Sequence, residues 1–406
     1  MNLAKNSLWL LLARIGTQGM AALSTILLAR RLGSAGFGEY AVIAAIVFIG
    51  NMLTTFGTDM SLIREIAAHD DLALLPAALY IQLGLSFPLI VLIWLAAPLL
   101  PIQSADGIFA LRLYILVLIP LAGFTVFTSA LRGRQAMGAY AALNLMSALI
   151  QFAALWIFMN ASVARLAVLL LAVQIVTTLA GAAVCHFAIS DFWRAWRFDA
   201  KAVSHLLKIS SPFAVLTVLA MLYQRLGILM LAAFGGPLLT GLFSAAQRTV
   251  EGAKTAHGAV FTALYPAMAQ SRRESFHASW RYLLGGAGLG AISLSALAMP
   301  LTRALFGVGY EASVPALQIL SWTLIPYTVG TFLTLKFAAS KRTKPILRAS
   351  LVSLLALALL GLWLIPNWGL RGAGATILIA ETLQTALLAA QWRQNEFSEF
   401  SRKAHA

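Results

Sequence analysis

The stretch LGLSFPLIVLIWLAAPLL, residues 83–100, contains no charged side chain. An α-helix needs about 20 mainly apolar residues to cross the hydrocarbon core of a bilayer. Comparable stretches recur along the chain, for example at residues 111–130 and 351–365. None shows the alternation of a barrel strand, so helices are the remaining structure that can span a membrane. The pattern predicts an all-α polytopic membrane protein.

The overall composition supports this prediction. Of the 406 residues, 60% are hydrophobic and 11% are charged, whereas soluble domains carry roughly 25% charged residues. The formal net charge is +15, a balance often found in nucleic-acid-binding proteins. Here Lys and Arg lie mostly in short connections between apolar stretches, so we expect no nucleic-acid partner. One cysteine, Cys185, excludes an internal disulfide and a cysteine-based metal site.

Twelve spans are predicted from the apolar stretches. They lie at about residues 8–28, 38–58, 74–97, 108–130, 138–160, 164–187, 207–233, 238–266, 280–300, 313–338, 346–366 and 371–392. With the N-terminus in the cytoplasm, most Lys and Arg residues near span ends fall on the cytoplasmic side, as the positive-inside rule requires. We therefore expect both termini to be cytoplasmic.

The longest connection, ISDFWRAWRFDAKAVSHLLK, lies between the sixth and seventh spans. It predicts two six-helix halves. The predicted parts are an N-terminal six-helix bundle at 1–190, a cytoplasmic linker at 191–207, a C-terminal six-helix bundle at 208–393 and a cytoplasmic tail at 394–406.

A weak internal repeat favours the same division. LARRLGSAGFGEYAVIAA, residues 28–45, aligns with LAAFGGPLLTGLFSAAQ, residues 231–247, if a one-residue gap is allowed. The matched pairs are Gly33 with Gly235, Gly38 with Gly241, and Tyr40 with Phe243. Repeated halves of this kind build many transporters around a central site.

Five cations lie away from the predicted span ends. They are Arg14, Arg225, Arg248, Lys254 and Lys336. A centred Arg or Lys costs about 2.5–3.5 kcal/mol on insertion scales, so such residues usually face a cavity or a partner.

The eighth span carries two of these cations. Arg248, Glu251 and Lys254 follow one another at intervals of three residues, which places them on one broad helix face. A salt bridge to Glu251 neutralises one cation and leaves one positive charge within the helix. We predict that this face lines a polar cavity.

The other intramembrane polar residues leave alternatives open. Arg14 and Gln18 lie one turn apart in the first span, which favours a cavity over an extended reach to the headgroups. Arg225 faces either a cavity or the outer interface, and Lys336 is expected to reach the cytoplasmic interface. Glu381 and Gln384 form a polar pair in the last span, and interhelical hydrogen bonding explains them equally well.

The sequence lacks the signatures of the common enzyme classes. There is no GxxxxGK[ST] loop, no HExxH motif and no GxSxG motif. The outer connections offer two carboxylates, Asp106 and Glu311, which read as solvated loop residues. We therefore predict no catalytic residues and no metal site.

Several ordered motifs resemble a known family. They are ILLARRLGSAGFGEYAVIAAIV (26–47), TFGTDMSLIREIAA (55–68), ALRGRQAMGAYAALN (130–144), FGGPLLTGLFSAAQR (234–248) and LFGVGYEASVPALQILSW (305–322). Together they are similar to bacterial polysaccharide exporters of the O-antigen flippase type. That family belongs to the multidrug, oligosaccharidyl-lipid and polysaccharide exporter superfamily.

The resemblance implies a fold and a function. The fold is two six-helix bundles around a central cavity, working by alternating access in the bacterial inner (plasma) membrane. The cargo is an oligosaccharide linked to polyprenyl pyrophosphate, moved from the inner to the outer leaflet for surface polysaccharide such as lipopolysaccharide O-antigen. Implied partners are membrane lipids, a polysaccharide polymerase and glycosyltransferases. No cofactor is implied, although transport is often coupled to H⁺ or Na⁺.

The resemblance also implies cavity cations that bind the pyrophosphate. By depth and charge, the candidates are Arg14, Arg225, Arg248 and Lys254. Further candidates for the cavity or for ion coupling are Gln18, Asp59, Glu251, Lys336 and Glu381. Three alternatives stay open: an ion-coupled multidrug exporter of the same superfamily, a membrane enzyme of glycan assembly, and a peptidoglycan-precursor flippase.

Overall fold

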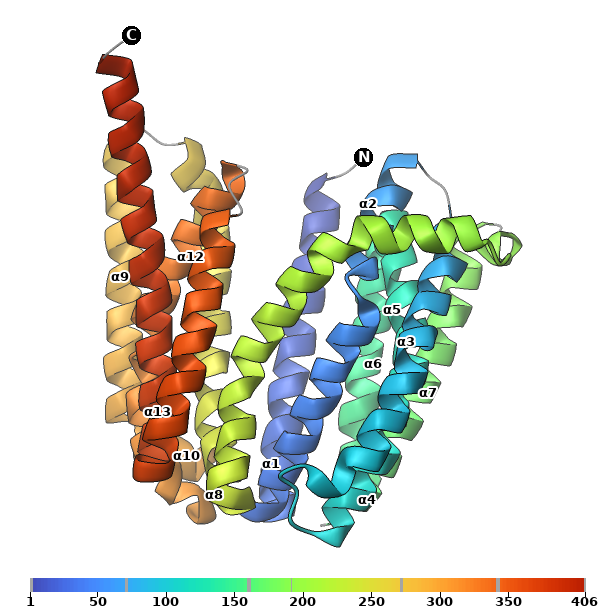
Figure 1. The fold of residues 1–406 in the computed structure, drawn as a ribbon, viewed down its shortest axis with the longest axis horizontal. Coiled ribbons are helices and arrows are strands. Elements are labelled where there is room, and N and C mark those ends of the chain that lie inside the picture. The colour runs from blue at the N-terminus through green and yellow to red at the C-terminus, as the bar shows by residue number, and fades with distance from the viewer. Residues whose placement is uncertain are drawn as a thin grey trace. The chain divides into compact units, whose positions relative to one another are not determined.

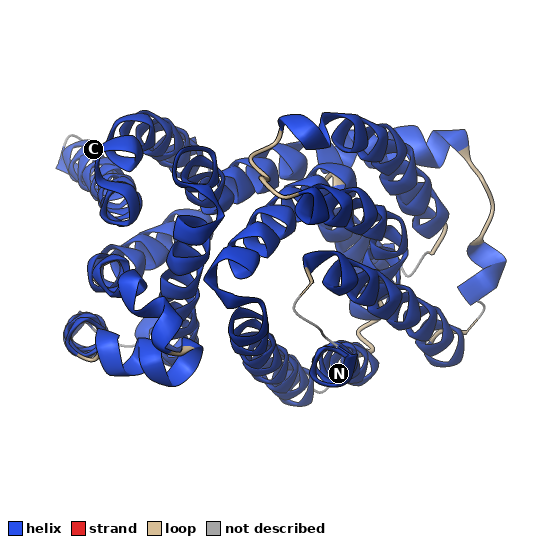
Figure 2. Ribbon diagram, turned by 90° about the horizontal axis from the view of Figure 1, so that it is seen from below, coloured by secondary structure: helices blue, strands red, loops and turns tan. Residues whose placement is uncertain are grey.

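The computed structural model describes residues 3–69, 72–158, 162–190, 192–270, 273–340 and 344–404. Within these ranges the regular structure is helical and no residue is in a strand, as Figure 2 shows. The predicted all-α class is confirmed.

Thirteen α-helices and four short 3-10 helices make up this part of the chain. The α-helices are α1 (Leu3–Thr55), α2 (Thr58–His69), α3 (Leu74–Ala96), α4 (Ala105–Tyr114), α5 (Leu118–Gly133), α6 (Met137–Phe158), α7 (Val163–Ala188), α8 (Ala200–Gln270), α9 (Arg273–Ala296), α10 (Ala298–Phe306), α11 (Val314–Ser321), α12 (Leu324–Ala339) and α13 (Lys344–Ala404). The 3-10 helices are η1 (Ala97–Leu99), η2 (Ile115–Val117), η3 (Phe192–Ala195) and η4 (Val308–Ser313).

Three of the long helices consist of two limbs that meet at a glycine. Gly33 in α1 has φ 70°, Gly236 in α8 has φ 71° and Gly369 in α13 has φ 52°. Side chains with a Cβ rarely adopt positive φ, so glycine is the residue suited to these turns. Figure 1 shows the limbs of α1 running in opposite directions, and likewise those of α13.

The apolar helices account for the predicted spans. Among the described residues, seven helices are long and apolar enough to cross a membrane. Two further pairs pass the same test together, Arg281–Ala296 with Ala298–Phe306, bent by 71°, and Val308–Ser321 with Leu324–Phe337, bent by 42°. When the limbs of α1, α8 and α13 are counted separately, twelve segments result, as the sequence predicted.

The glycine turns correct the register of the internal repeat. The residue of α8 with the turn conformation is Gly236, not Gly235, and its backbone angles match those of Gly33 (ψ −175° and 175°). Gly33 and Gly236 are then the same distance apart in sequence as Gly38 and Gly241, so no gap is needed. Gly38 and Gly241 are both buried. The same hairpin therefore occurs once in each half of the sequence.

The chain divides into two compact units, Met1–Met221 and Leu222–Ala406. The division falls inside α8. The predicted linker at 191–207 precedes it and supplies two side chains to the core of the first unit. Phe192 and Leu206 are fully buried, and the Phe192 ring lies 6.0 Å from that of Phe127. Burying these apolar side chains stabilises the packing of this segment against the first unit.

Polar contacts connect the helices of the first unit. Gln82 Nε2 on α3 donates to Thr58 Oγ1 on α2 at 2.9 Å, and Ser210 Oγ on α8 donates to Ser61 Oγ on α2 at 2.9 Å. The single thiol, Cys185, is fully buried and lies 3.4 Å from the carbonyl oxygen of Phe127.

Asp106 in the first turn of α4 and Glu311 in η4 each have structural partners. Asp106 accepts hydrogen bonds from the backbone nitrogens of Val163 and Ala164, at 3.1 and 3.3 Å, and so satisfies the first turn of α7. Glu311 accepts from Arg303 Nε at 2.5 Å.

The turn at Gly33 gives a stability test. A Cβ added there meets no atom within 4 Å, so Gly33→Ala adds backbone strain without a steric clash. We expect a loss of about 1–3 kcal/mol in the free energy of unfolding, measured as a lowered unfolding temperature of the detergent-solubilised protein.

Gly19→Ala is the matched control, because Gly19 lies in the helical part of α1 and its added Cβ also meets nothing within 4 Å. Alanine is favoured over glycine in a helix, so this variant should unfold at the same temperature or higher. Equal unfolding temperatures for Gly33→Ala and the parent protein would contradict the assignment of the turn.

Candidate functional site

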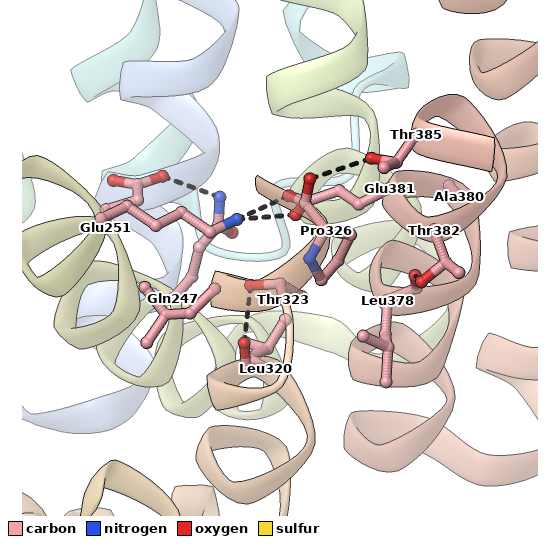
Figure 3. A network of polar contacts seen from close by, with 12 residues as sticks. Gln247, Glu251, Leu320, Thr323, Pro326, Leu378, Ala380, Glu381, Thr382 and Thr385 are labelled. Atoms are coloured by element: carbon pink, nitrogen blue, oxygen red, sulfur yellow. Dashed lines mark hydrogen bonds and ion pairs between the residues drawn. The ribbon is translucent and has the colours of Figure 1, made fainter. Parts of the chain in front are cut away.

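An ion pair joins α8 to α13 within the second unit. Lys254 Nζ lies 2.6 Å from Oε1 and 2.9 Å from Oε2 of Glu381, so one ammonium contacts both carboxylate oxygens. The side chains are 16% and 17% exposed. Figure 3 shows Glu381 directed toward the α8 face that carries Glu251.

A second pair lies on the same face of α8, where side chains three or four positions apart are neighbours. Arg248 Nη1 donates to Glu251 Oε2 at 3.1 Å, and Gln247 Nε2 donates to Glu251 Oε1 at 2.9 Å. This pair is more open than the first, since Arg248 is 44% exposed and Glu251 is 38% exposed. The predicted salt bridge within the helix is confirmed.

Helix α12 forms an aromatic and polar side of the site. The Lys254 ammonium lies 5.3 Å from the centre of the Tyr327 ring, a cation–π contact. One residue later, Thr328 Oγ1 lies 2.9 Å from His257 Nε2, one turn beyond Lys254 on α8. The contacts of Lys254 and His257 therefore tie α8 to both α12 and α13.

The close approach of α12 to α13 explains where Glu381 lies. Thr385 Oγ1 donates to the carbonyl oxygen of Pro326 at 2.9 Å, and a Cβ on Gly330 would lie 3.0 Å from the same hydroxyl. Small residues allow such close helix contacts in membrane proteins. Glu381 precedes Thr385 by one turn on the same face of α13, so this contact directs the carboxylate toward Tyr327 and Lys254.

Further polar groups surround Glu381 on α13. Gln384 Nε2 donates to Ser350 Oγ at 3.1 Å, and Ser353 Oγ donates to the carbonyl oxygen of Ala380 at 2.7 Å. The buried hydroxyl of Tyr223 on α8 is close enough to Glu381 to interact with it electrostatically. Interhelical hydrogen bonding, one of the two explanations offered by the sequence, holds for Gln384, whose bond to Ser350 joins the two limbs of α13, whereas Glu381 binds a cation.

The charge of this cluster differs from the prediction. The sequence suggested one positive charge left over on the Arg248 face. In the structure Glu251 pairs with Arg248 and Glu381 pairs with Lys254, so the four formal charges cancel. The missing partner comes from α13, 127 positions away in sequence, where helix periodicity carries no information.

The remaining predicted residues lie elsewhere. Arg14 and Gln18 are exposed on the first limb of α1, and Asp59 lies in the first turn of α2, all in the first unit. Arg225 is half-buried in α8. Lys336 is half-buried in α12, and its ammonium lies 4.8 Å from the Phe332 ring centre and 4.7 Å from that of Trp392.

Sequence reasoning missed the contributions of Tyr327, Thr328 and Gln247. Gln247 lies one turn before Glu251, a spacing that could have indicated it. Tyr327 and Thr328 have no comparable signal, since they are ordinary residues after a proline in an apolar span.

A comparison with known families identifies the chain. Residues 3–272 match the model of the family described as polysaccharide biosynthesis protein. The chain belongs to this family. The resemblance to polysaccharide exporters seen in the sequence is thereby confirmed. The match includes Arg248, Glu251 and Lys254 on α8, while Glu381 lies beyond it. No curated protein matches the chain.

Several solved structures have a similar fold at low sequence identity. The lipid II flippase MurJ in an inward closed conformation superposes with a TM-score of 0.76 at 14% identity, covering 96% of this chain and 87% of that one. A multidrug resistance MATE family transporter of the MOP superfamily, in an inward-facing conformation, gives 0.68 at 18% identity, covering 95% and 96%. A MOP superfamily transporter from Pyrococcus furiosus, described as having a binding pocket of reversed polarity, gives 0.61 at 17% identity, covering 95% and 93%.

The Lys254–Glu381 pair gives a second stability test. Lys254→Met leaves the Glu381 carboxylate without its counter-ion, and breaking a buried pair in this way costs about 3–5 kcal/mol. We expect a clear fall in the unfolding temperature in detergent, and recovery of much of it in the double variant Lys254→Met with Glu381→Gln.

The control removes a cation from the exposed pair between Arg303 and Glu311. Arg303 is 56% exposed, so Arg303→Met should change the unfolding temperature little. If Lys254→Met is no less stable than Arg303→Met, the pair does not stabilise the protein as the structure indicates.

Proposed function

We propose that this protein is a flippase for polyprenyl-pyrophosphate-linked oligosaccharide. It moves this lipid from the inner to the outer leaflet of the bacterial plasma membrane, for the synthesis of a surface polysaccharide such as O-antigen. The observation that carries the proposal is the cluster of Arg248 and Lys254 on one face of a helix long and apolar enough to span a membrane, in a chain of the polysaccharide biosynthesis family.

The chemistry of the cargo fits these side chains. A diphosphate cannot enter hydrocarbon without losing its hydration, which makes unaided crossing very costly. An Arg guanidinium binds phosphate oxygens through two parallel hydrogen bonds, and a Lys ammonium contributes a compact charge. Arg248 and Lys254 can therefore replace part of the hydration of a diphosphate while its prenyl chain stays in the lipid. Arg14 and Arg225 are proposed as further cations on the cargo path.

The proposed mechanism is alternating access coupled to H⁺ or Na⁺. The fold supports it, because MATE family transporters of the MOP superfamily have been solved in both inward-facing and outward-facing conformations. Glu251 and Glu381 are the proposed coupling carboxylates of the second unit, and Asp59 is the proposed one of the first. Gln18 and Lys336 are proposed to line the cargo path. A polysaccharide polymerase and glycosyltransferases are the proposed partners.

A multidrug exporter is the second candidate. It is favoured by Glu251 and Glu381, because these carboxylates could bind a cationic drug if Arg248 and Lys254 released them. A membrane enzyme of glycan assembly has less support, because both of its candidate catalytic carboxylates already have partners. Asp106 caps α7, and Glu311 pairs with Arg303.

Reconstitution into liposomes separates the two transport functions. We expect the parent protein to move a labelled undecaprenyl-diphosphate oligosaccharide between leaflets, measured by its accessibility to an enzyme added outside. The double variant Arg248→Gln with Lys254→Gln should lose at least about tenfold in rate, because each charge-assisted hydrogen bond contributes about 1.5–3 kcal/mol.

Arg303→Gln is the matched control, since it removes one cation outside the cluster. Normal lipid movement by the double variant would reject the role proposed for Arg248 and Lys254. Drug efflux by a parent protein that does not move the lipid would reject the flippase proposal and favour the multidrug exporter.

The proposed orientation places both termini in the cytoplasm. In a Cys185→Ala background, Ser204→Cys at the start of α8 should react with an impermeant maleimide only in inside-out vesicles. Val308→Cys, at a position that is 74% exposed, should react only in intact cells or right-side-out vesicles. The opposite labelling pattern would show that both termini lie outside the cytoplasm.

A further inference from the structure

The Lys254 ammonium is already occupied by groups of the protein. Both oxygens of Glu381 contact it at 2.6 and 2.9 Å, and the face of Tyr327 lies 5.3 Å away. An ammonium has three protons and no acceptor. Its protons are thus shared between a carboxylate and an aromatic ring, and an incoming anion must displace Glu381 to bind Lys254 directly.

Arg248 is in a different situation. It contacts Glu251 through Nη1 at 3.1 Å and is 44% exposed. A guanidinium has five donor protons in a fixed fork, so Arg248 can bind a phosphate while it keeps its contact with Glu251. Two cations on one helix face therefore respond differently to the same anion, and Lys254 is the one that must exchange partners.

The displaced Glu381 carboxylate has a poor environment for its charge. The titratable and charged groups around it are Lys254 and Tyr223 from α8, Tyr327 from α12, and, further along α8, Glu251 and His257. Glu251 is itself an anion paired with Arg248. The Glu381 side chain is 17% exposed. A carboxylate that loses its counter-ion at such low exposure is more stable with a bound proton than with its charge.

We propose that Glu381 acts as an internal competitor of the cargo. It occupies Lys254 in the empty protein, a diphosphate displaces it, and the displaced carboxylate binds a proton. Glu381 is thus a positioning residue that links cargo binding to proton uptake. This inference rests on the proposed function, since it assumes that a diphosphate reaches Lys254.

The exchange also sets specificity. The interaction of a singly charged anion with Lys254 is about as favourable as the interaction that Glu381 already makes. Such an anion therefore displaces the carboxylate poorly. A diphosphate brings more charge and also reaches Arg248. By the reciprocity of linked binding, protonation of Glu381 strengthens diphosphate binding by the same factor as diphosphate binding favours protonation.

Isothermal titration calorimetry tests the exchange with farnesyl diphosphate as the probe. The parent protein in detergent is titrated near neutral pH in two buffers of different ionisation enthalpy, and the protonation of the free ligand is measured separately. We expect uptake of up to about one proton per ligand beyond that of the ligand itself. Glu381→Gln should lose this excess uptake and bind the probe at least about fivefold more tightly.

The matched control is Glu311→Gln, which neutralises a carboxylate of an ion pair outside the cluster and should behave as the parent protein does. Farnesyl methyl phosphate, a diester with a single negative charge, provides the specificity arm, and Glu381→Gln should increase its affinity by a larger factor than that of the diphosphate.

The outcomes separate the two proposals. If the parent protein binds farnesyl diphosphate without excess proton uptake, or if Glu381→Gln weakens binding, the exchange is wrong while the proposed cargo stands. If the parent protein does not bind farnesyl diphosphate, the proposed function fails and the exchange fails with it. The proton count of the parent protein decides the question even if Glu381→Gln does not fold.

Discussion

The interior of a bilayer offers no water to satisfy polar groups, and the features described here follow from this constraint. Backbone amides and carbonyls must bond within the chain, which leaves helices as the repeating structure. Charged side chains must find partners, which explains why Lys254 contacts a carboxylate and an aromatic ring together. The same constraint makes each polar group inside the membrane informative, because a functional role or a specific partner has to compensate its cost.

The helical fold was predictable because its signal is local. A run such as residues 83–100 specifies a spanning helix whatever surrounds it, and twelve such segments could be recognised without knowing their contacts. The turns were less predictable. Gly235 and Gly236 are adjacent and chemically identical, and only the backbone angles show that the chain reverses at Gly236. The packing of the predicted linker was not predictable either, because Phe192 and Leu206 are buried in a core that the sequence alone does not reveal.

The charged residues of the candidate site were predictable, but their connections were not. Depth and charge identified Arg248, Lys254, Glu251 and Glu381 as unusual residues within apolar spans. Helix periodicity paired Arg248 with Glu251, because that contact is local. It could not pair Lys254 with Glu381, since this contact depends on how closely α13 approaches α12 at Gly330 and Thr385. The predicted surplus of positive charge was therefore an error of long-range pairing, not of composition.

The glycine turns at Gly33 and Gly236 have a consequence for how the chain enters the membrane. Each joins two apolar limbs through a single non-helical residue, so no extended polar connection needs to be carried across the bilayer. A ribosome-bound channel that releases helices one at a time would leave the last carbonyl groups of the first limb unsatisfied until the second limb has formed. The two limbs are best accommodated when they leave the channel together as a hairpin, and the duplicated turn makes this step of biogenesis common to both halves of the protein.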